Sequence, residues 1–496
     1  MKRALLSLAV ILFCQLNAEA QNPFDKARQN VGGGNTSAFN QNRVNNFNDY
    51  RQRLNVEYIS KTREKWNDFN ANRALIDPNR DKKPVKPIEM SDEDARRERK
   101  DKQIEFDGVV SPIKDNRKAQ PIAPVDEVPE TTPQYFSFPY LGTSLQVRKP
   151  QATVTLNGVS EHAVADAWTR LCEPAFNNMV VDCLKLRTSL QLCDWAYLMM
   201  LQALGNAYCG ANTNEAILLM AFIYSQSGYK MRLAEANGRL EMLYASQHNV
   251  YETPYFRLDG DNFYVMRKTA TALRITAAKY PKEQSMSLWV GGSPQVPFSA
   301  SPQRTLTSKR YSDMSVHVSV NKNLLPFFDS YPTSEVGGNF MTRWAMYANT
   351  PICKETRNEL YPQLKQYVAN RSQLDAVERL LNWVQTAFVY EYDDKVWGGD
   401  RALFADETLY YPYCDCEDRS ILFTRLVRDL LGLKCILIYY PGHLAAAVCF
   451  TEAVNGDYIQ VNGSRYVVCD PTYIGASVGH TMPQMDNATA KVIVLQ

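Results

Sequence analysis

Three residues late in this chain have the types and the order of a thiol catalytic centre. Cys416 lies in the run Tyr411-Pro-Tyr-Cys-Asp-Cys-Glu-Asp-Arg-Ser420, and His443 and Asp470 follow at equal intervals of 27 residues. In such a centre a cysteine attacks a carbonyl carbon, a histidine takes the thiol proton, and a carboxylate orients the histidine. The sequence therefore predicts Cys416 as nucleophile, His443 as base and Asp470 as the orienting group.

The residues after the cysteine predict a helix. Apolar side chains recur at helical spacing over 417–431, and Gly432 is placed to end the helix. A cysteine in the first turn meets unpaired backbone N–H groups and the positive end of the helix dipole, which favour an anion. With an imidazole partner, this position predicts a pKa for Cys416 below the usual value of about 8.5. Arg419 and His443 are the nearby cationic candidates.

The other two residues fall in a predicted antiparallel sheet. Four β-rich runs follow the helix, at 434–440, 444–450, 458–461 and 466–470. Pro441-Gly442 breaks the first run from the second, so His443 begins the second strand. Asp470 ends a neighbouring strand, within hydrogen-bond reach of the imidazole. The predicted fold class is α+β, with a helix bearing the cysteine packed on a sheet bearing the histidine and the aspartate.

Residues 374 to 482 resemble the transglutaminase-like superfamily, a papain-like group of cysteine enzymes. Cys416-Glu-Asp-Arg-Ser420 resembles the nucleophile element of that family, Gly442-His443 the base, and Asp470-Pro-Thr472 the third member. Leu444 stands where the family commonly has an aromatic residue. The resemblance implies a papain-like core and acyl transfer through a thioester intermediate.

The resemblance also implies a class of substrate. Peptide or amide hydrolysis is the preferred expectation, because the resemblance is to secreted bacterial members. A protein-glutamine acyltransferase that cross-links glutamine to an amine is an alternative, and so is a non-catalytic peptide-binding scaffold. A protein or peptide substrate is expected, and no cofactor.

Other roles for the cysteines stay open. Cys414 is expected to be structural or to form a disulfide, since cysteines of secreted chains commonly do so. A zinc site made of the Cys-x-Cys pair, the histidine and the aspartate fits no common ligand spacing, so no metal is expected. Four further cysteines are candidates for disulfides whose pairing the sequence does not give: Cys172, Cys183, Cys193 and Cys209.

An internal repeat precedes the candidate site. Residues 212–230 align with 416–434 at a shift of 204, and 260–265 align with 463–468 at a shift of 203. In this register the triad positions hold different residues, namely Asn212, Arg239 and Arg267. The pattern predicts a second, degenerate transglutaminase-like copy over 150–275; the alternative is a chance match of two amphipathic helices.

An aromatic and acidic loop, 389–412, separates a predicted helix at 374–388 from the nucleophile. Loops of this length beside a site commonly form a substrate wall. Trp397, Tyr411 and Tyr413 are the candidates to line it and to supply an oxyanion donor. Its carboxylates are expected to be solvated, because no regular calcium-binding loop is visible.

Composition and the amino-terminal residues set the broader class. A length of 496 residues permits about three domains. A net charge of +2 without a dense basic stripe argues against nucleic acid as a partner. Lys2-Arg3, an apolar run over 4–13 and Ala18-Glu-Ala20 predict a signal peptide at 1–20, hence a secreted, periplasmic or cell-surface bacterial protein. No later apolar run is long enough to span a membrane. The oligomeric state cannot be read from the sequence.

The remaining segments complete the predicted organisation. A polar part at 21–75 contains a predicted amphipathic helix from about 37 to 74, and a Pro- and charge-rich linker follows at 76–135. A β-rich connection is predicted at 276–350, with strands at 286–290 and 314–320. The predicted catalytic domain occupies 351–496.

Overall fold

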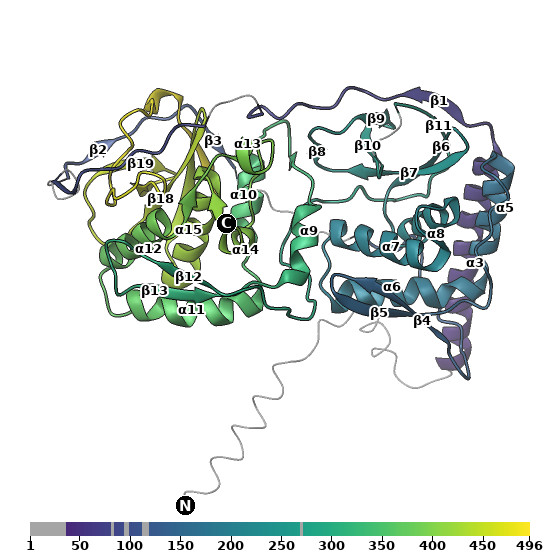
Figure 1. Ribbon diagram of the computed structural model, residues 1–496. Helices are drawn as coiled ribbons and strands as arrows, with labels where there is room; N and C mark the ends of the chain where they lie inside the picture. Colours follow the sequence, from purple (N-terminus) through teal and green to yellow (C-terminus); the bar gives the residue numbers. More distant parts are fainter. Residues whose placement is uncertain (1–35, 81–83, 94–98, 112–118, 268–270) are drawn as a thin grey trace, which may run out of the picture. The chain divides into compact units, whose positions relative to one another are not determined.

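The computed structural model describes residues 36–80, 84–93, 99–111, 119–267 and 271–496 (Figure 1). The predicted signal peptide at 1–20 lies outside these residues. The chain divides into two units, 1–53 and 54–496. The described part of the first unit is helical, and apart from helix α3 everything discussed below lies in the second unit. Among the described residues, no helix combines the length and apolar character needed to cross a bilayer.

Helix α3 (Thr36–Arg63) ends well before residue 74, so the predicted amphipathic helix is too long. Its end is fixed by Trp66, which is buried and whose indole N–H donates to the Thr62 carbonyl at 2.9 Å. Strand β1 (Asn67–Asn70) follows at once and pairs with β11 (Ala272–Ile275). Of the aromatic residues in this segment, Trp66 therefore stabilises the end of the helix and Phe69 lies in a strand.

Two largely antiparallel sheets and the helices packed on them form the second unit, in agreement with the predicted α+β class. The strands of the first sheet include β6 (Met231–Ala236), β7 (Arg239–Ser246), β9 (Tyr255–Leu258) and β10 (Asp261–Val265). The strands of the second include β17 (Lys434–Tyr440), β18 (His443–Cys449), β19 (Asp457–Val461), β20 (Ser464–Cys469) and β21 (Lys491–Val494).

The two sheets share one strand order. β11-β6-β7-β10-β9 in the first corresponds to β21-β17-β18-β20-β19 in the second. A helix precedes each set in the chain, α8 (Asn214–Gln226) in the first and α15 (Cys416–Leu431) in the second. A gene duplication would produce such a repeated order. The degenerate copy predicted over 150–275 stays an interpretation of this repeated order.

Helices complete a first lobe (161–275) and a second lobe (342–494). The first lobe contains α5 (Glu161–Leu171), α6 (Asn177–Ser189), α7 (Asp194–Cys209) and α8; the second contains α10 (Thr342–Asn349), α11 (Lys354–Val368), α12 (Gln373–Ala387), α13 (Asp393–Val396), α14 (Ala405–Tyr410) and α15. Their ends follow ordinary rules: the Ser372 side chain caps α12 by accepting from the Asp375 N–H, and Gly432 ends α15 with φ of 68°.

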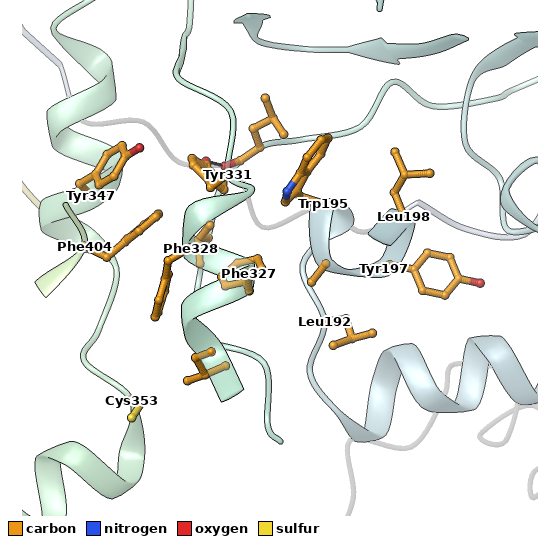
Figure 2. Close-up of a cluster of buried hydrophobic side chains, with 14 of the residues drawn as sticks. Leu192, Trp195, Tyr197, Leu198, Phe327, Phe328, Tyr331, Tyr347, Cys353 and Phe404 are labelled. Atoms are coloured by element: carbon orange, nitrogen blue, oxygen red, sulfur yellow. Dashed lines mark hydrogen bonds between the residues drawn. The ribbon is translucent and has the colours of Figure 1, made fainter. Parts of the chain in front are cut away.

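Aromatic side chains near α9 (Leu325–Asp329) connect the lobes (Figure 2). Phe404 packs on Tyr347 with ring centroids 4.2 Å apart, and on Phe328 at 4.9 Å. On the first-lobe side, the indole of Trp195 donates to the Ser330 hydroxyl at 3.2 Å. These contacts belong to one continuous buried core.

The predicted connection at 276–350 is only partly β-structure. Strand β13 (Ser315–Val318) pairs with β12 (Arg304–Thr307), which confirms a strand within 314–320. The predicted strand at 286–290 is absent; in that segment Met286 makes one isolated bridge, to Ser246.

The prediction of a linker at 76–135 is wrong for its described residues. Strand β2 (Lys102–Gln103) pairs with β19, and β3 (Val109–Val110) pairs with β21, at the two edges of the second sheet. The linker prediction fails because edge pairing uses backbone groups, which a polar, Pro-rich composition does not reveal.

The described cysteines carry free thiols, so the predicted disulfides among Cys172, Cys183, Cys193 and Cys209 are not formed. Cys183 is fully buried and belongs to the apolar core. Burial in such a core is the common alternative to a disulfide for a small thiol side chain.

Phe404→Ala is expected to lower the free energy of unfolding by about 3–5 kcal/mol, because it removes a 2 % exposed ring from among three others. Urea unfolding followed by fluorescence checks this. Phe298→Ala is the control, since that ring is 42 % exposed and its loss should change the unfolding free energy by at most about 0.5 kcal/mol. Equal effects of the two substitutions would contradict this account of the core.

Candidate active site

Helix α15 places Cys416 at its first position, as predicted. Asp415 precedes the helix, and its backbone N–H donates to the Asp418 carboxylate at 3.2 Å. The apolar face of α15 packs on strands β17 and β18, and the Ser420 hydroxyl donates to the Leu444 carbonyl at 2.8 Å. This packing brings the helix start to the start of β18, where His443 lies.

His443 and Asp470 are joined as the sequence predicts. Strands β18 and β20 are antiparallel neighbours, with Ala446 opposite Cys469. His443 Nε2 lies 2.8 Å from Asp470 Oδ2, and both side chains are buried. A carboxylate accepting from Nε2 places the proton of a neutral imidazole on that nitrogen and leaves Nδ1 as the base. Nδ1 is buried and makes no hydrogen bond within the described residues.

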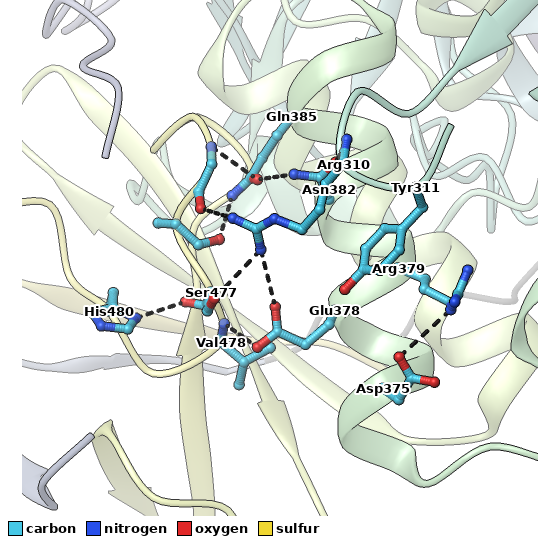
Figure 3. A network of polar contacts seen from close by, with 12 residues as sticks. Arg310, Tyr311, Asp375, Glu378, Arg379, Asn382, Gln385, Ser477, Val478 and His480 are labelled. Carbon is cyan, nitrogen blue, oxygen red and sulfur yellow. Dashed lines mark hydrogen bonds and ion pairs between the residues drawn. The ribbon is translucent and has the colours of Figure 1, made fainter. Parts of the chain in front are cut away.

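The loop that carries Asp470 is fixed from helix α12 (Figure 3). The Gln385 side chain, 1 % exposed, donates to the carbonyls of Asp470, Tyr473 and Ala476 at 2.8–3.0 Å. The other Asp470 oxygen, Oδ1, accepts from the Thr472 N–H at 2.8 Å. Each carboxylate oxygen therefore has its own partner, and the orientation of the carboxylate is set.

Polar contacts from the same helix extend to the rest of the loop. The Glu378 carboxylate accepts from the Val478 N–H at 3.0 Å, and Arg310 lies 3.9 Å from Glu378 (Figure 3). Burial raises the pKa of Glu378, and Arg99 and Arg310 oppose that effect. Helix α12 therefore holds the Asp470 loop at two points, Gln385 and Glu378.

Cys416 and His443 line one small cavity. Its volume is about 30 Å³, which is room for about one water molecule. Four of the other lining residues come from outside the segments that hold Cys416 and His443: Asn79, Pro84, Trp344 and Asp400. The remaining five lie close to those two residues in sequence: Asp415, Glu417, Tyr439, Gly442 and Leu444. Cys416 and His443 are each 2 % exposed. The thiol and the imidazole are therefore almost completely covered in this structure.

Trp344 is the functional candidate that sequence reasoning missed. It lies on α10, is 1 % exposed, and its indole Nε1 is buried without a hydrogen bond among the described residues. Its ring stacks on Tyr439 at 5.1 Å, which fixes its orientation at the cavity. A buried donor lining the same cavity as the thiol is suited to hold an oxyanion. Nothing in the sequence around residue 344 signals this role.

The three aromatic candidates of the 389–412 loop lie elsewhere. Trp397 packs edge-on against Tyr411 with centroids 4.7 Å apart, and the Arg401 guanidinium lies over the Trp397 ring at 4.4 Å. Tyr413 is 41 % exposed. None of Trp397, Tyr411 and Tyr413 lines the cavity that contains the thiol, so the structure does not bring them to the nucleophile.

The electrostatics of the thiol differ from the sequence expectation. Burial raises the pKa of Cys416 well above its usual value, and the Asp415 and Glu417 carboxyls raise it further. The Leu444 backbone amide acts in the opposite direction but is outweighed. Arg419, expected as a cationic partner, donates instead to backbone carbonyls at the end of α12. In this structure Cys416 is therefore a thiol that retains its proton.

The neighbouring cysteine takes no part in the cavity. The Cys414 thiol is directed at the Val389 carbonyl, with 3.9 Å between sulfur and oxygen. Burial raises its pKa, with Arg419 opposing. Cys414 is therefore a buried thiol next to the nucleophile, as the structural alternative predicted.

Five carboxyl groups gather beneath the start of α15: Asp393, Asp400, Asp415, Glu417 and Asp418. Oxygens of Asp393, Asp400 and Glu417 lie within 4.8 Å of one another, and so do oxygens of Asp393, Asp415 and Asp418. Side chains of this type could hold a hard cation. The Arg343 guanidinium, 1 % exposed, already pairs with Asp400 and lies 3.6 Å from Glu417.

The prediction that the loop carboxylates are solvated is wrong for Asp393, Asp406 and Glu407, which are buried. Burial raises the pKa of Asp393 to about 9, with Asp418 and Glu417 adding to the effect. Asp393 is therefore protonated at neutral pH. Because the loop folds back under α15, acidic residues that look like a solvated run become part of the interior.

The aligned positions of the first lobe hold residues of different chemistry. Arg239 begins β7 as His443 begins β18, and its guanidinium lies 3.5 Å from the Asn212 carbonyl. Arg267 follows β10 and pairs with Glu241 at 3.1 Å. No thiol, imidazole or carboxylate stands at Asn212, Arg239 or Arg267, so the first lobe holds no triad at these positions.

Comparison of this chain with known protein families and with curated proteins finds no match. The transglutaminase-like resemblance therefore stays a hypothesis carried by residues and geometry.

Raising the pH is expected to destabilise the protein through Asp393. Its pKa is about 9 when folded and about 3.9 when unfolded. Between these values the folded state binds the extra proton, so the free energy of unfolding falls as pH rises, by at most about 1.4 kcal/mol per pH unit for this group. Asp393→Asn should flatten this fall, because an amide does not titrate. The variant should still fold, since the amide oxygen can accept the hydrogen bond that the Arg401 N–H now donates to Asp393 Oδ2 at 2.7 Å.

Urea unfolding from pH 5 to pH 8.5 checks this expectation. The matched control is Asp394→Asn, since Asp394 is the exposed neighbour. Parallel pH profiles for wild type and Asp393→Asn would show that Asp393 does not carry the buried proton.

Proposed function

We propose that this protein is a cysteine enzyme of the transglutaminase-like type, with a papain-like core, which acts on peptide or amide bonds through Cys416, His443 and Asp470. One observation carries the proposal. The Cys416 thiol and the imidazole of His443 line the same cavity, and Asp470 holds one ring nitrogen while the other has no hydrogen bond within the described residues. A ring nitrogen without a hydrogen bond next to a thiol is available to accept the thiol proton.

The arrangement supports acyl transfer in two stages. His443 Nδ1 takes the proton from the Cys416 sulfur, and the thiolate attacks the substrate carbonyl carbon. The imidazolium then gives the proton to the leaving amine, which leaves a thioester on Cys416. A water molecule or a second amine, deprotonated by Nδ1, attacks the thioester and releases the enzyme. Asp470 stabilises the imidazolium during both stages.

The oxyanion formed in each stage needs donors that point into the cavity. Trp344 lines the cavity, and its indole N–H has no hydrogen bond within the described residues. The first turn of α15 has backbone N–H groups that are not used within the helix. The helix dipole favours negative charge at the same place. These donors replace the loop aromatics that the sequence suggested.

Two alternatives use the same residues differently. An acyltransferase that joins glutamine to an amine differs only in whether water or an amine attacks the thioester. A non-catalytic peptide-binding protein is favoured by one observation, the raised pKa of the buried Cys416 thiol. A site that opens to solvent loses much of the burial that raises this pKa, so an enzyme with a closed resting form accounts for it as well.

His443→Ala is expected to slow alkylation of Cys416 by iodoacetamide at least tenfold, because the thiol loses its base, and to lower turnover by about 10²–10⁴-fold. Alkylation is mapped by mass spectrometry of each cysteine. Cys449, half-buried in the same sheet, is the internal control and should label at an unchanged rate. Equal labelling of Cys416 in wild type and variant would sink the assignment of His443 as base.

Trp344→Phe is expected to lower kcat for peptide hydrolysis or amine incorporation by about 10²–10³-fold, because it removes one oxyanion donor. The ring still stacks on Tyr439, so folding should be preserved. Alkylation of Cys416 forms no oxyanion and should proceed at the wild-type rate. A parallel loss of both would indicate a packing role for Trp344, and wild-type turnover would exclude it as a donor.

A further inference from the structure

A short segment of the predicted linker lies against the candidate site. Residues 84–90, called the strap below, run past His443 and then along the loop of Asp470. The Val85 N–H donates to the Gly442 carbonyl at 2.9 Å, directly before the base. Farther on, the Met90 N–H donates to the Ile474 carbonyl at 2.8 Å, and the Ile474 N–H donates to the Ile88 carbonyl at 3.0 Å. The strap is thus held through its backbone, as an added strand would be.

Its side chains alternate between the protein and solvent. Val85, Ile88 and Met90 pack against an apolar cluster of three residues from the Asp470 loop and its continuation: Tyr473, Ala476 and Met482. Lys86 and Glu89 are exposed. Backbone pairing with inward apolar side chains is how a groove binds an extended peptide.

The strap also closes the cavity of the thiol. Pro84 lines that cavity, together with Asn79 from the segment before the strap. Asp77 in that segment pairs with the buried Arg343. With these residues in place the cavity holds about one water molecule, and Cys416 is 2 % exposed. The Cys416 side chain is therefore almost inaccessible to a substrate carbonyl in this arrangement.

We propose that the strap is a built-in inhibitor: residues 84–90 occupy the path of an extended substrate polypeptide across Cys416 and His443, and they must leave before a substrate binds. This inference rests on the proposed function, because only an enzyme has a substrate. It adds that the strap covers the site in the resting protein. It also adds that the substrate is an extended polypeptide. The backbone of this polypeptide pairs with Gly442 and Ile474, and its apolar side chains lie where Ile88 and Met90 now lie.

The first test compares two variants of the strap. Ile88→Ser/Met90→Ser removes the inward apolar contacts, and Lys86→Ser/Glu89→Ser changes the same number of outward residues. Alkylation of Cys416 by iodoacetamide is measured by mass spectrometry. The inward variant should label at least tenfold faster than wild type, and the outward variant at the wild-type rate. A synthetic Pro-Val-Lys-Pro-Ile-Glu-Met peptide should restore slow labelling of the inward variant, and a scrambled peptide should not.

A second measurement uses the wild-type protein and so does not depend on the variants folding. Hydrogen exchange at the Val85 and Met90 amides should be at least a hundredfold faster than at the β17–β18 core, and it should follow the same denaturant dependence as Cys416 alkylation. Exchange of the strap only together with the core would overturn the proposal, because the strap would then open only by global unfolding. Equal labelling of the inward variant and wild type would also overturn it.

Failure of the inhibitor proposal and failure of the proposed function give different results. A strap that gates the thiol changes the labelling rate whether or not His443 is present. In the inward variant, His443→Ala should slow labelling again at least tenfold. Fast labelling that ignores His443→Ala would retain the strap as a cover but remove the catalytic assignment.

Discussion

The buried hydrogen bond between His443 Nε2 and Asp470 Oδ2, 2.8 Å long, is the contact on which the candidate site depends. It requires that β18 and β20 be neighbours, which fixes the two backbones. It also requires that the Asp470 loop hold its shape, which Gln385 on α12 ensures by binding three carbonyls. Because Asp470 uses Nε2, the histidine presents Nδ1 to the cavity. Helix α15, packed on the same strand, then needs only to place Cys416 at its first residue.

Carboxyl groups gather next to this contact, at the start of α15. Five carboxyls lie beneath the nucleophile, and burial raises the pKa of Asp393, Asp415, Glu417 and Asp418. Protons and the guanidinium of Arg343 limit the net charge of the cluster. The same guanidinium pairs with Asp77, next to the strap, so the acidic cluster and the cover of the site share one cation. Solvent that entered the site would therefore change the protonation of the acidic cluster and also weaken the pairing of Arg343 with Asp77.

The two lobes share a strand order but differ at the three positions of the candidate site. Both have a helix followed by strands in one order, but the first holds Asn212, Arg239 and Arg267 where the second holds its triad. The aromatic contacts around Phe404 join the lobes in a single core. A scaffold of this kind supports the loop 389–412, which folds back beneath α15. The first lobe therefore contributes to the site by fixing the elements around it, with no reactive group at the matching positions.

The sequence by itself determined the local elements and their order. Apolar spacing gave the helix at 416–431 and the strands that follow, and the pairing of His443 with Asp470 could be expected from neighbouring antiparallel strands. Tertiary structure alone decided the rest. Trp344 and Pro84 of the strap reach the cavity from distant parts of the chain, and Trp397, Tyr411 and Tyr413 do not line it. The pKa of Cys416 rises where the helix start predicted a fall, because burial and carboxyl neighbours outweigh the dipole. Periodicity records what a residue does within its own element, whereas burial and long-range partners depend on how the elements pack.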